Sequence, residues 1–256
     1  MATRVGIPDE YYALPLALPL RNRRDGLFDL TLKSPAELAL ALRQRHLDGA
    51  LLSSIDYAKD YAMYRIVPGV GISSSGESRT ILLAFREHLR SITTIAFDPR
   101  FGADIVLAVI VLAEKYDTKP KLVPVSGTPE NMLSAADCAL LVGNAAVRYQ
   151  EHLQKLDLVE EWEDISGLPF VHAFWVAREN ALDAETMEAL KQVATLSDGE
   201  LPGDLPPDFF EAFQYGMDDD AIAGLSEFLR MAYYHGILSD LPEVKFHSPA
   251  SGNTVF

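Results

Sequence analysis

The feature that most constrains the fold is a unit of strand, capped helix and strand that occurs once in each half of the chain. It spans Leu30–Ser54 and again Leu122–Asn144. Ser34 in the first copy and Thr128 in the second are N-cap residues, and each precedes a proline, whose missing N–H is harmless at the first helical position. Both copies end in a short apolar run with little alternation, typical of a strand covered on both faces. The repeat predicts two similar α/β lobes, each a sheet with helices on both sides.

Two long apolar runs are placed to carry the chain from one lobe to the other and back. They occupy residues 79–85 and 169–177. We therefore predict two crossover strands, near Thr80–Phe85 and Phe170–Trp175, which would act as the hinge between the lobes.

These crossings divide the chain into a discontinuous first lobe, residues 1–84 and 177–256, and a second lobe, residues 85–176. Within the second lobe, Ala103–Lys115 predicts a helix that is apolar all round and therefore buried. A loop rich in proline, glycine and aspartate is expected at residues 197–208. The C-terminal helices are expected to pack back on the first lobe, and they are predicted at residues 183–196, 208–217 and 219–238.

Charge and composition exclude several classes of function. A formal net charge of −15 disfavours nucleic acids and anionic membranes as partners. The single cysteine, Cys138, excludes an internal disulfide and lies in an apolar run, so we expect an inert buried thiol. No stretch has the length and apolarity of a membrane helix or an export leader, which predicts a cytoplasmic protein.

Metal and cofactor motifs are missing from the sequence. The six histidines have no ligand spacing, and no nucleotide-binding glycine motif occurs, so we expect no metal site and no cofactor. His172 lies in the apolar run FVHAFW, where a hydrogen-bonded core histidine is the default interpretation and a pocket role the alternative.

The loops that follow the predicted strands are the candidates for a ligand site. In open α/β sheets, ligands bind in the crevice outside the carboxyl ends of the strands. Five loops qualify, and each carries polar residues: 8–12, 55–57, 73–78, 98–102 and 143–145. Ser53 and Ser54 lie at the end of the strand that precedes the second loop. The sequence thus predicts a cleft between the lobes that closes over one small organic molecule.

Four segments of the chain resemble one known family. They are LLSSIDYA, VPGVGISSSGESRTILLAF, CALLVGNAAV and WEDISGLPFVHAFWVAREN, and the similarity extends over roughly Ala50 to Asn180. Their order and spacing are similar to those of the family that contains chorismate dehydratase of the futalosine route to menaquinone. The resemblance implies a two-lobed type II periplasmic-binding-protein-like fold that works in the cytoplasm without metal or organic cofactor.

The same resemblance implies a lyase that eliminates water from chorismate to give 3-[(1-carboxyvinyl)oxy]benzoate. The ligand would then be a carboxylic acid, and the protein a monomer or a homodimer. The open alternative is a non-catalytic small-molecule-binding protein, or a divergent relative that acts on a different small ligand.

Three positions depart from the family pattern. Tyr12 stands where the family has an asparagine before the Pro-Leu pair, and Asn144 stands where it has an acid. Ala103 and Asp104 replace a Thr-Ser pair at a helix start, where hydroxyls and free N–H groups would hold a carboxylate. We expect Asp104 to cap that helix and to repel a carboxylate, so that the ligand is less anionic or is held by Arg79 or Arg100.

The candidate site follows from these loops and from the resemblance. The catalytic base stays open, and the candidates for catalysis are Ser74, Ser78 and Tyr12. The residues expected to contact ligand are Ser53, Ser54, Ser73, Ser74, Ser75, Arg79, Thr80, Asp98, Arg100, Asp104 and Asn144. For the serines the alternative role is to satisfy backbone groups in turns, for the arginines it is solvent exposure, and for Tyr12 it is core packing. Ser54, Ser74, Asp98 and Asn144 are predicted to face one common pocket.

Overall fold

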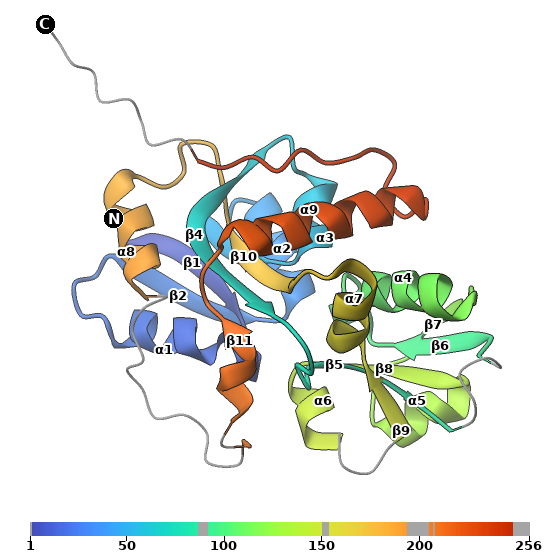
Figure 1. Ribbon diagram of the computed structural model, residues 1–256. Coiled ribbons are helices and arrows are strands. Elements are labelled where there is room, and N and C mark those ends of the chain that lie inside the picture. Colours follow the sequence, from blue (N-terminus) through green and yellow to red (C-terminus); the bar gives the residue numbers. More distant parts are fainter. Residues whose placement is uncertain (1, 87–91, 150–153, 194–204, 207, 248–256) are drawn as a thin grey trace, which may run out of the picture.

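The chain folds around two separate β-sheets, as the computed structural model shows (Figure 1). The structure describes residues 2–86, 92–149, 154–193, 205–206 and 208–247. The predicted loop at 197–208 lies almost entirely outside the described residues.

In the described part of the chain the first sheet has six strands, of which β1 lies between β2 and β3 and runs parallel to both. Its strands, in spatial order, are β11 (Phe213–Gln214), β4 (Tyr64–Ser74), β10 (Phe170–Arg178), β3 (Gly49–Leu52), β1 (Thr3–Pro8) and β2 (Phe28–Lys33).

The second sheet repeats this arrangement, because β6 lies between β7 and β8 and is parallel to both. Its strands, in spatial order, are β7 (Lys121–Pro124), β6 (Thr94–Phe97), β8 (Cys138–Val142), β5 (Ile81–Phe85) and β9 (Gln154–Asp157). The order β2-β1-β3 in the first sheet thus corresponds to the order β7-β6-β8 in the second. The repeated strand, helix and strand unit and the two-lobed α/β architecture are confirmed.

Helices cover both sheets (Figure 1). Those that follow strands of the first sheet are α1 (Leu14–Asn22), α2 (Pro35–Arg43), α3 (Ser54–Lys59), α8 (Ala184–Val193) and α9 (Asp219–Tyr234). Those of the second lobe are α4 (Ile105–Tyr116), α5 (Pro129–Ala135), α6 (Asn144–Tyr149) and α7 (Leu158–Ser166). Short 3-10 turns occur at η1 (Tyr11–Ala13), η3 (Pro99–Phe101) and η5 (Phe209–Ala212).

The predicted caps form as the residue types require. The backbone N–H of Ser34 donates to Glu37 at 3.1 Å at the start of α2, and the Thr128 hydroxyl accepts from the Asn131 N–H at the start of α5. Helix α4 is apolar around its circumference and forms the centre of the second core, together with β5, β8 and α7.

The two strands predicted to cross between the lobes each lie within a single sheet instead. β5 pairs with β8 and β9 inside the second sheet, and β10 pairs with β3 and β4 inside the first. The chain crosses between the sheets in the short segments 75–80 and 167–169, so the predicted boundaries at 84/85 and 176/177 fall within or near the end of a strand. The physical reason is that an apolar strand buried on both faces has the same pattern in either sheet.

Helix α9 spans both lobes and does not pack on the first alone. Its Leu225 and Leu229 lie in the core of the first lobe, and its Phe228 and Met231 lie in that of the second. At Gly224 the helix approaches the second crossing so closely that a Cβ would lie 2.1 Å from the Pro169 carbonyl oxygen. The helix therefore packs directly on the hinge.

The predicted helix at 208–217 is wrong in its second half. Only the 3-10 turn η5 forms, and Phe213–Gln214 then adds β11 to the edge of the first sheet beside Ser73 and Ser74. Among the described residues, no helix has the length and apolarity needed to cross a membrane.

Candidate functional site

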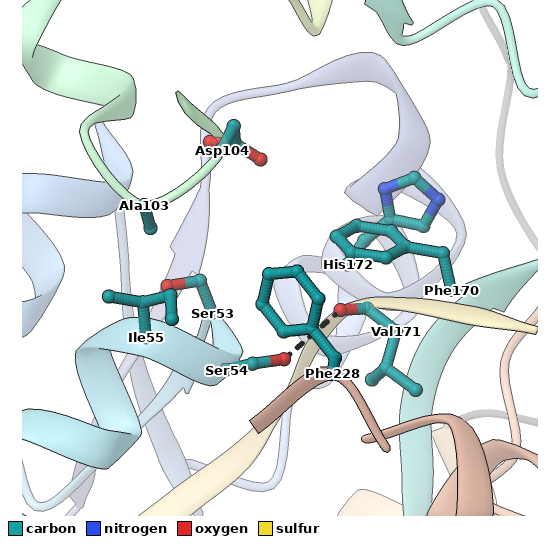
Figure 2. Close-up of a pocket in the computed structure, with 9 residues that line it drawn as sticks. All are labelled: Ser53, Ser54, Ile55, Ala103, Asp104, Phe170, Val171, His172 and Phe228. Atoms are coloured by element: carbon teal, nitrogen blue, oxygen red, sulfur yellow. Dashed lines mark hydrogen bonds between the residues drawn. The ribbon is translucent and has the colours of Figure 1, made fainter. Parts of the chain in front are cut away.

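The candidate site is a small pocket between the lobes (Figure 2). It lies where α3 begins after β3 in the first lobe and where α4 begins after β6 in the second, with β10 and α9 as further walls. Its cavity of about 10 Å³ holds roughly one water molecule and is too small for an organic ligand in this structure. The lining residues are Ser53, Ser54, Ile55, Ala103, Asp104, Phe170, Val171, His172 and Phe228.

The two predicted serines line this pocket, and their hydroxyls also bind the protein. Ser53 Oγ is 2.9 Å from the Asp56 carboxylate and accepts from the Asp56 N–H at 3.1 Å, which caps α3. Ser54 Oγ donates to the Val171 carbonyl at 3.4 Å, a long contact. Both of the roles considered for these serines are therefore compatible with the structure.

His172 connects the predicted residue Ser74 to the pocket. Its Nε2 is 2.6 Å from Ser74 Oγ, and the two side chains are 6% and 2% exposed. The ring packs edge-on against Phe170, with 5.1 Å between ring centroids, and lies 5.6 Å from the ring of Tyr12. Burial lowers the pKa of His172 to about 3, so the imidazole is neutral near pH 7.

Asp104 lines the opposite wall, and its expected role as a helix cap is wrong. Its backbone is helical, with φ −73° and ψ −24°, whereas a capping residue is extended, and its side chain forms no capping bond. The first N–H groups are satisfied by tight turns instead, because Asp104 N–H donates to Phe101 O and Val106 N–H to Ala103 O.

Asp104 lines the pocket, and its carboxyl has no basic partner among the described residues. Its pKa is raised to about 7, first by burial and then by the negative charges of Asp56 and Glu10. Near neutral pH this carboxyl holds both its protonated and its ionised form.

Asn144, a predicted ligand contact, joins the two lobes. Its backbone N–H donates to Glu10 Oε2 at 2.6 Å, and its Oδ1 accepts from the Tyr11 N–H at 2.7 Å. Gly143 makes this approach possible, because a Cβ there would lie 2.1 Å from Glu10 Oε2. Burial raises the pKa of Glu10 to about 7.

The two predicted arginines do not line the pocket. Arg79 pairs with Asp208 at 3.0 Å, and Arg100 pairs with Asp98 at 2.7 Å and is largely exposed. Asp98 also caps η3 by accepting from the Arg100 N–H. Of the four residues predicted to share a pocket, Ser54 lines it, and Ser74 contacts the lining residue His172. Asp98 and Asn144 bind other parts of the chain.

The remaining predicted residues lie at the end of β4 and in the first crossing. Ser78 and Thr80 are buried, with their hydroxyls 3.0 Å apart, and Ser78 also contacts Asp157. Ser73 Oγ is buried and has no hydrogen-bond partner among the described residues, and Ser75 is exposed. Gly76, which follows Ser75, donates its N–H to the Glu163 carboxylate of α7, so this crossing is bound to the second lobe.

A family described as menaquinone biosynthesis matches residues 3–200 of the chain. The chain belongs to this family. The match covers both sheets except β11, and it includes every lining residue of the pocket but Phe228. The family expected from the four sequence segments is thereby confirmed.

Solved structures share the fold of this menaquinone-biosynthesis family member. Protein AF1704 from Archaeoglobus fulgidus is 17% identical, with a TM-score of 0.62 over 91% of this chain and 97% of that one. The periplasmic aliphatic sulphonate binding protein SsuA from Escherichia coli is 13% identical, with a TM-score of 0.61 over 95% of each chain. A protein described as an ABC transporter from Parabacteroides distasonis is 18% identical, with a TM-score of 0.65 over 96% of this chain and 98% of that one. The periplasmic-binding-protein-like fold is confirmed.

Sequence reasoning did not select several residues of the site in this family member: Ile55, Phe170, Val171, His172 and Phe228, which line the pocket, and Glu10, whose charge acts on Asp104. Glu10 belonged to a candidate loop but was not selected, and His172 was assigned to the core by default. Phe228 comes from α9, which was expected on the first lobe only. The available signal was a lone polar residue, His172, in an apolar strand that follows the segment Gly167-Leu168-Pro169.

Proposed function

We propose that the protein is a lyase of the chorismate dehydratase type, which eliminates water from chorismate to give 3-[(1-carboxyvinyl)oxy]benzoate in menaquinone biosynthesis, in the cytoplasm. One observation carries the proposal. The segments LLSSIDYA and GLPFVHAFW, on which the family resemblance rests, are far apart in sequence and meet at one pocket through Ser53, Ser54, Phe170 and His172.

The chemistry fits a cleft that closes. An elimination needs a base for the ring hydrogen, help for the departing hydroxyl, and exclusion of bulk water. The pocket offers a carboxyl group, an imidazole and two serine hydroxyls between aromatic walls. Because the present cavity holds roughly one water molecule, a ring-sized substrate would enter when the lobes separate at the crossings.

The second candidate is a binding protein, or a relative that acts on a less anionic ligand. It is favoured by the charges around the pocket: the negative charges of Asp56 and Glu10 act on Asp104, and no arginine or lysine is among the described lining residues. A dicarboxylate such as chorismate would then bind mainly when Asp104 is protonated.

The two candidates are separated by incubating the purified protein with chorismate and separating the mixture by chromatography. The proposal predicts 3-[(1-carboxyvinyl)oxy]benzoate in amounts proportional to protein and time. Calorimetric titration with chorismate accompanies the assay. Binding without any product would favour the binding protein, and neither binding nor product would favour a different ligand.

A further inference from the structure

The pocket presents two polar groups that the fold leaves for a ligand. Among the described residues, the Asp104 carboxyl has no partner other than its own backbone N–H. Of the two ring nitrogens of His172, only Nε2 has a hydrogen-bond partner in the described part of the chain. Figure 2 shows Asp104 and His172 on opposite sides of the pocket, with Ser53 and Ser54 below them.

The fold fixes the backbone that carries Asp104 and the side chain of His172, which helps to place groups for acid–base chemistry. The backbone of Asp104 belongs to the tight turn that starts α4, where its N–H donates to Phe101 O at 3.0 Å. His172 is fixed by Ser74 and by the rings of Phe170 and Tyr12. If the Ser74 hydroxyl donates to Nε2, the proton of the neutral ring is on Nδ1, which can then donate to a substrate oxygen.

We infer that Asp104 is the residue that transfers the proton in the proposed elimination, and that His172, positioned by Ser74, binds a substrate oxygen on the opposite side of the cleft. This inference rests on the proposed function. It assigns the base that the sequence left open, and it assigns it to a position where the family pattern has a hydroxyl residue.

The elimination needs no proton donor or acceptor other than the substrate and Asp104. The carboxylate takes the hydrogen from the ring carbon next to the one that bears the hydroxyl, and the electron pair of that C–H bond forms the new ring double bond. The C–O bond breaks and its electron pair leaves with the oxygen. Asp104 returns the proton to this oxygen, so one water molecule leaves and the carboxylate is regenerated.

The electrostatics of the position support this role. A pKa of about 7 for Asp104 means that a base and an acid form coexist at neutral pH, which favours proton transfer in both directions. The titratable groups that face Asp104 from neighbouring elements are Asp56 on α3, and Glu10 and Tyr12 after β1. None of these three groups is a cation that would lower the pKa of Asp104.

The first test is the pH dependence of kcat for the wild type and Asp104→Asn. The wild type should lose activity below about pH 7, as the base becomes protonated. Asp104→Asn should lower kcat by about 10²- to 10⁴-fold, leave KM unchanged or lower it, and remove this acidic limb. Asp164→Asn, an exposed change on α7, should leave activity unchanged.

The second test separates binding from chemistry. His172→Phe should raise KM by about 10- to 100-fold, since it removes a hydrogen bond to a charged oxygen, and change kcat less. Ser74→Ala should raise KM in the same direction and change kcat less, with partial recovery of KM in Ser74→Thr. Unchanged KM in folded His172→Phe would overturn the binding role of His172.

Failure of the inference and failure of the proposed function are distinguishable. If the wild type forms no product, the proposed function fails. If the wild type is active and folded Asp104→Asn retains more than half of its kcat with the same pH profile, the proposed function stands and the role of Asp104 is wrong. Circular dichroism of each variant establishes that it is folded.

Discussion

Replacing Asp104 by asparagine should make the protein more stable at neutral and alkaline pH. The folded state raises the pKa of this carboxyl from 3.8 to about 7, so the unfolded chain ionises it first. The free energy of unfolding is therefore unaffected by this group below about pH 3.8, where both states are protonated, and it falls as the pH rises from there to about 7. At 1.36 kcal/mol for each pKa unit, the free energy of unfolding falls by about 4 kcal/mol in all. This value is the upper limit of the stability that Asp104→Asn should recover at pH 8.

The assay is urea denaturation of wild type and variant at several pH values. We expect nearly equal stability at pH 4 and the full difference at pH 8. Each comparison is made at one pH because His172, with its pKa lowered to about 3, changes stability in the opposite sense between pH 6.5 and 3.

Asp48→Asn is the matched control for this prediction. The hydrogen bonds from Arg4 lower the pKa of Asp48, so its ionised form stabilises the fold. The control should therefore lower stability at pH 8. The reasoning about Asp104 is refuted if Asp104→Asn is no more stable than the wild type at pH 8, or if its effect does not depend on pH.

Three further predictions concern the hinge, the lobe contact and the core. Gly224→Ala should destabilise the protein by about 1–3 kcal/mol in urea denaturation, because its Cβ would meet the Pro169 carbonyl, whereas Gly216→Ala meets open space and should be neutral. Glu10→Ala should increase the radius of gyration in small-angle scattering, since it removes a contact between the lobes; an unchanged radius would contradict the lobe contact. Burial raises the pKa of the Cys138 thiol to about 12, so iodoacetamide should react with it more than about 100-fold more slowly in the folded than in the urea-unfolded protein; equal rates would show that the thiol is accessible.

The two-lobed fold could be predicted because short local sequence patterns indicate its helices and strands. A proline after Ser34 or Thr128 marks a helix start, and a short apolar run marks a buried strand, so the repeat is visible without any long-range information. The crossings could not be located, because β5 and β10 are apolar on both faces whichever sheet they join. Pairing partners, and not composition, decide that question.

The site was predictable where a rule about strand ends applies. Ser53, Ser54 and Asp104 follow β3 and β6, and the structure places all three on the pocket. Glu10 and His172 depend on contacts between distant segments, which no local pattern reports. The orientation of Asp104 also depends on the turn before α4, whose helical backbone keeps the side chain from capping.

The proposed elimination is tested most directly by following chorismate with proton NMR in the presence of the protein. The account predicts that the ring signals of chorismate are replaced by aromatic signals of 3-[(1-carboxyvinyl)oxy]benzoate in one-to-one yield, at a rate proportional to protein and strongly reduced in Asp104→Asn. A chorismate spectrum that stays unchanged with folded wild-type protein would contradict it.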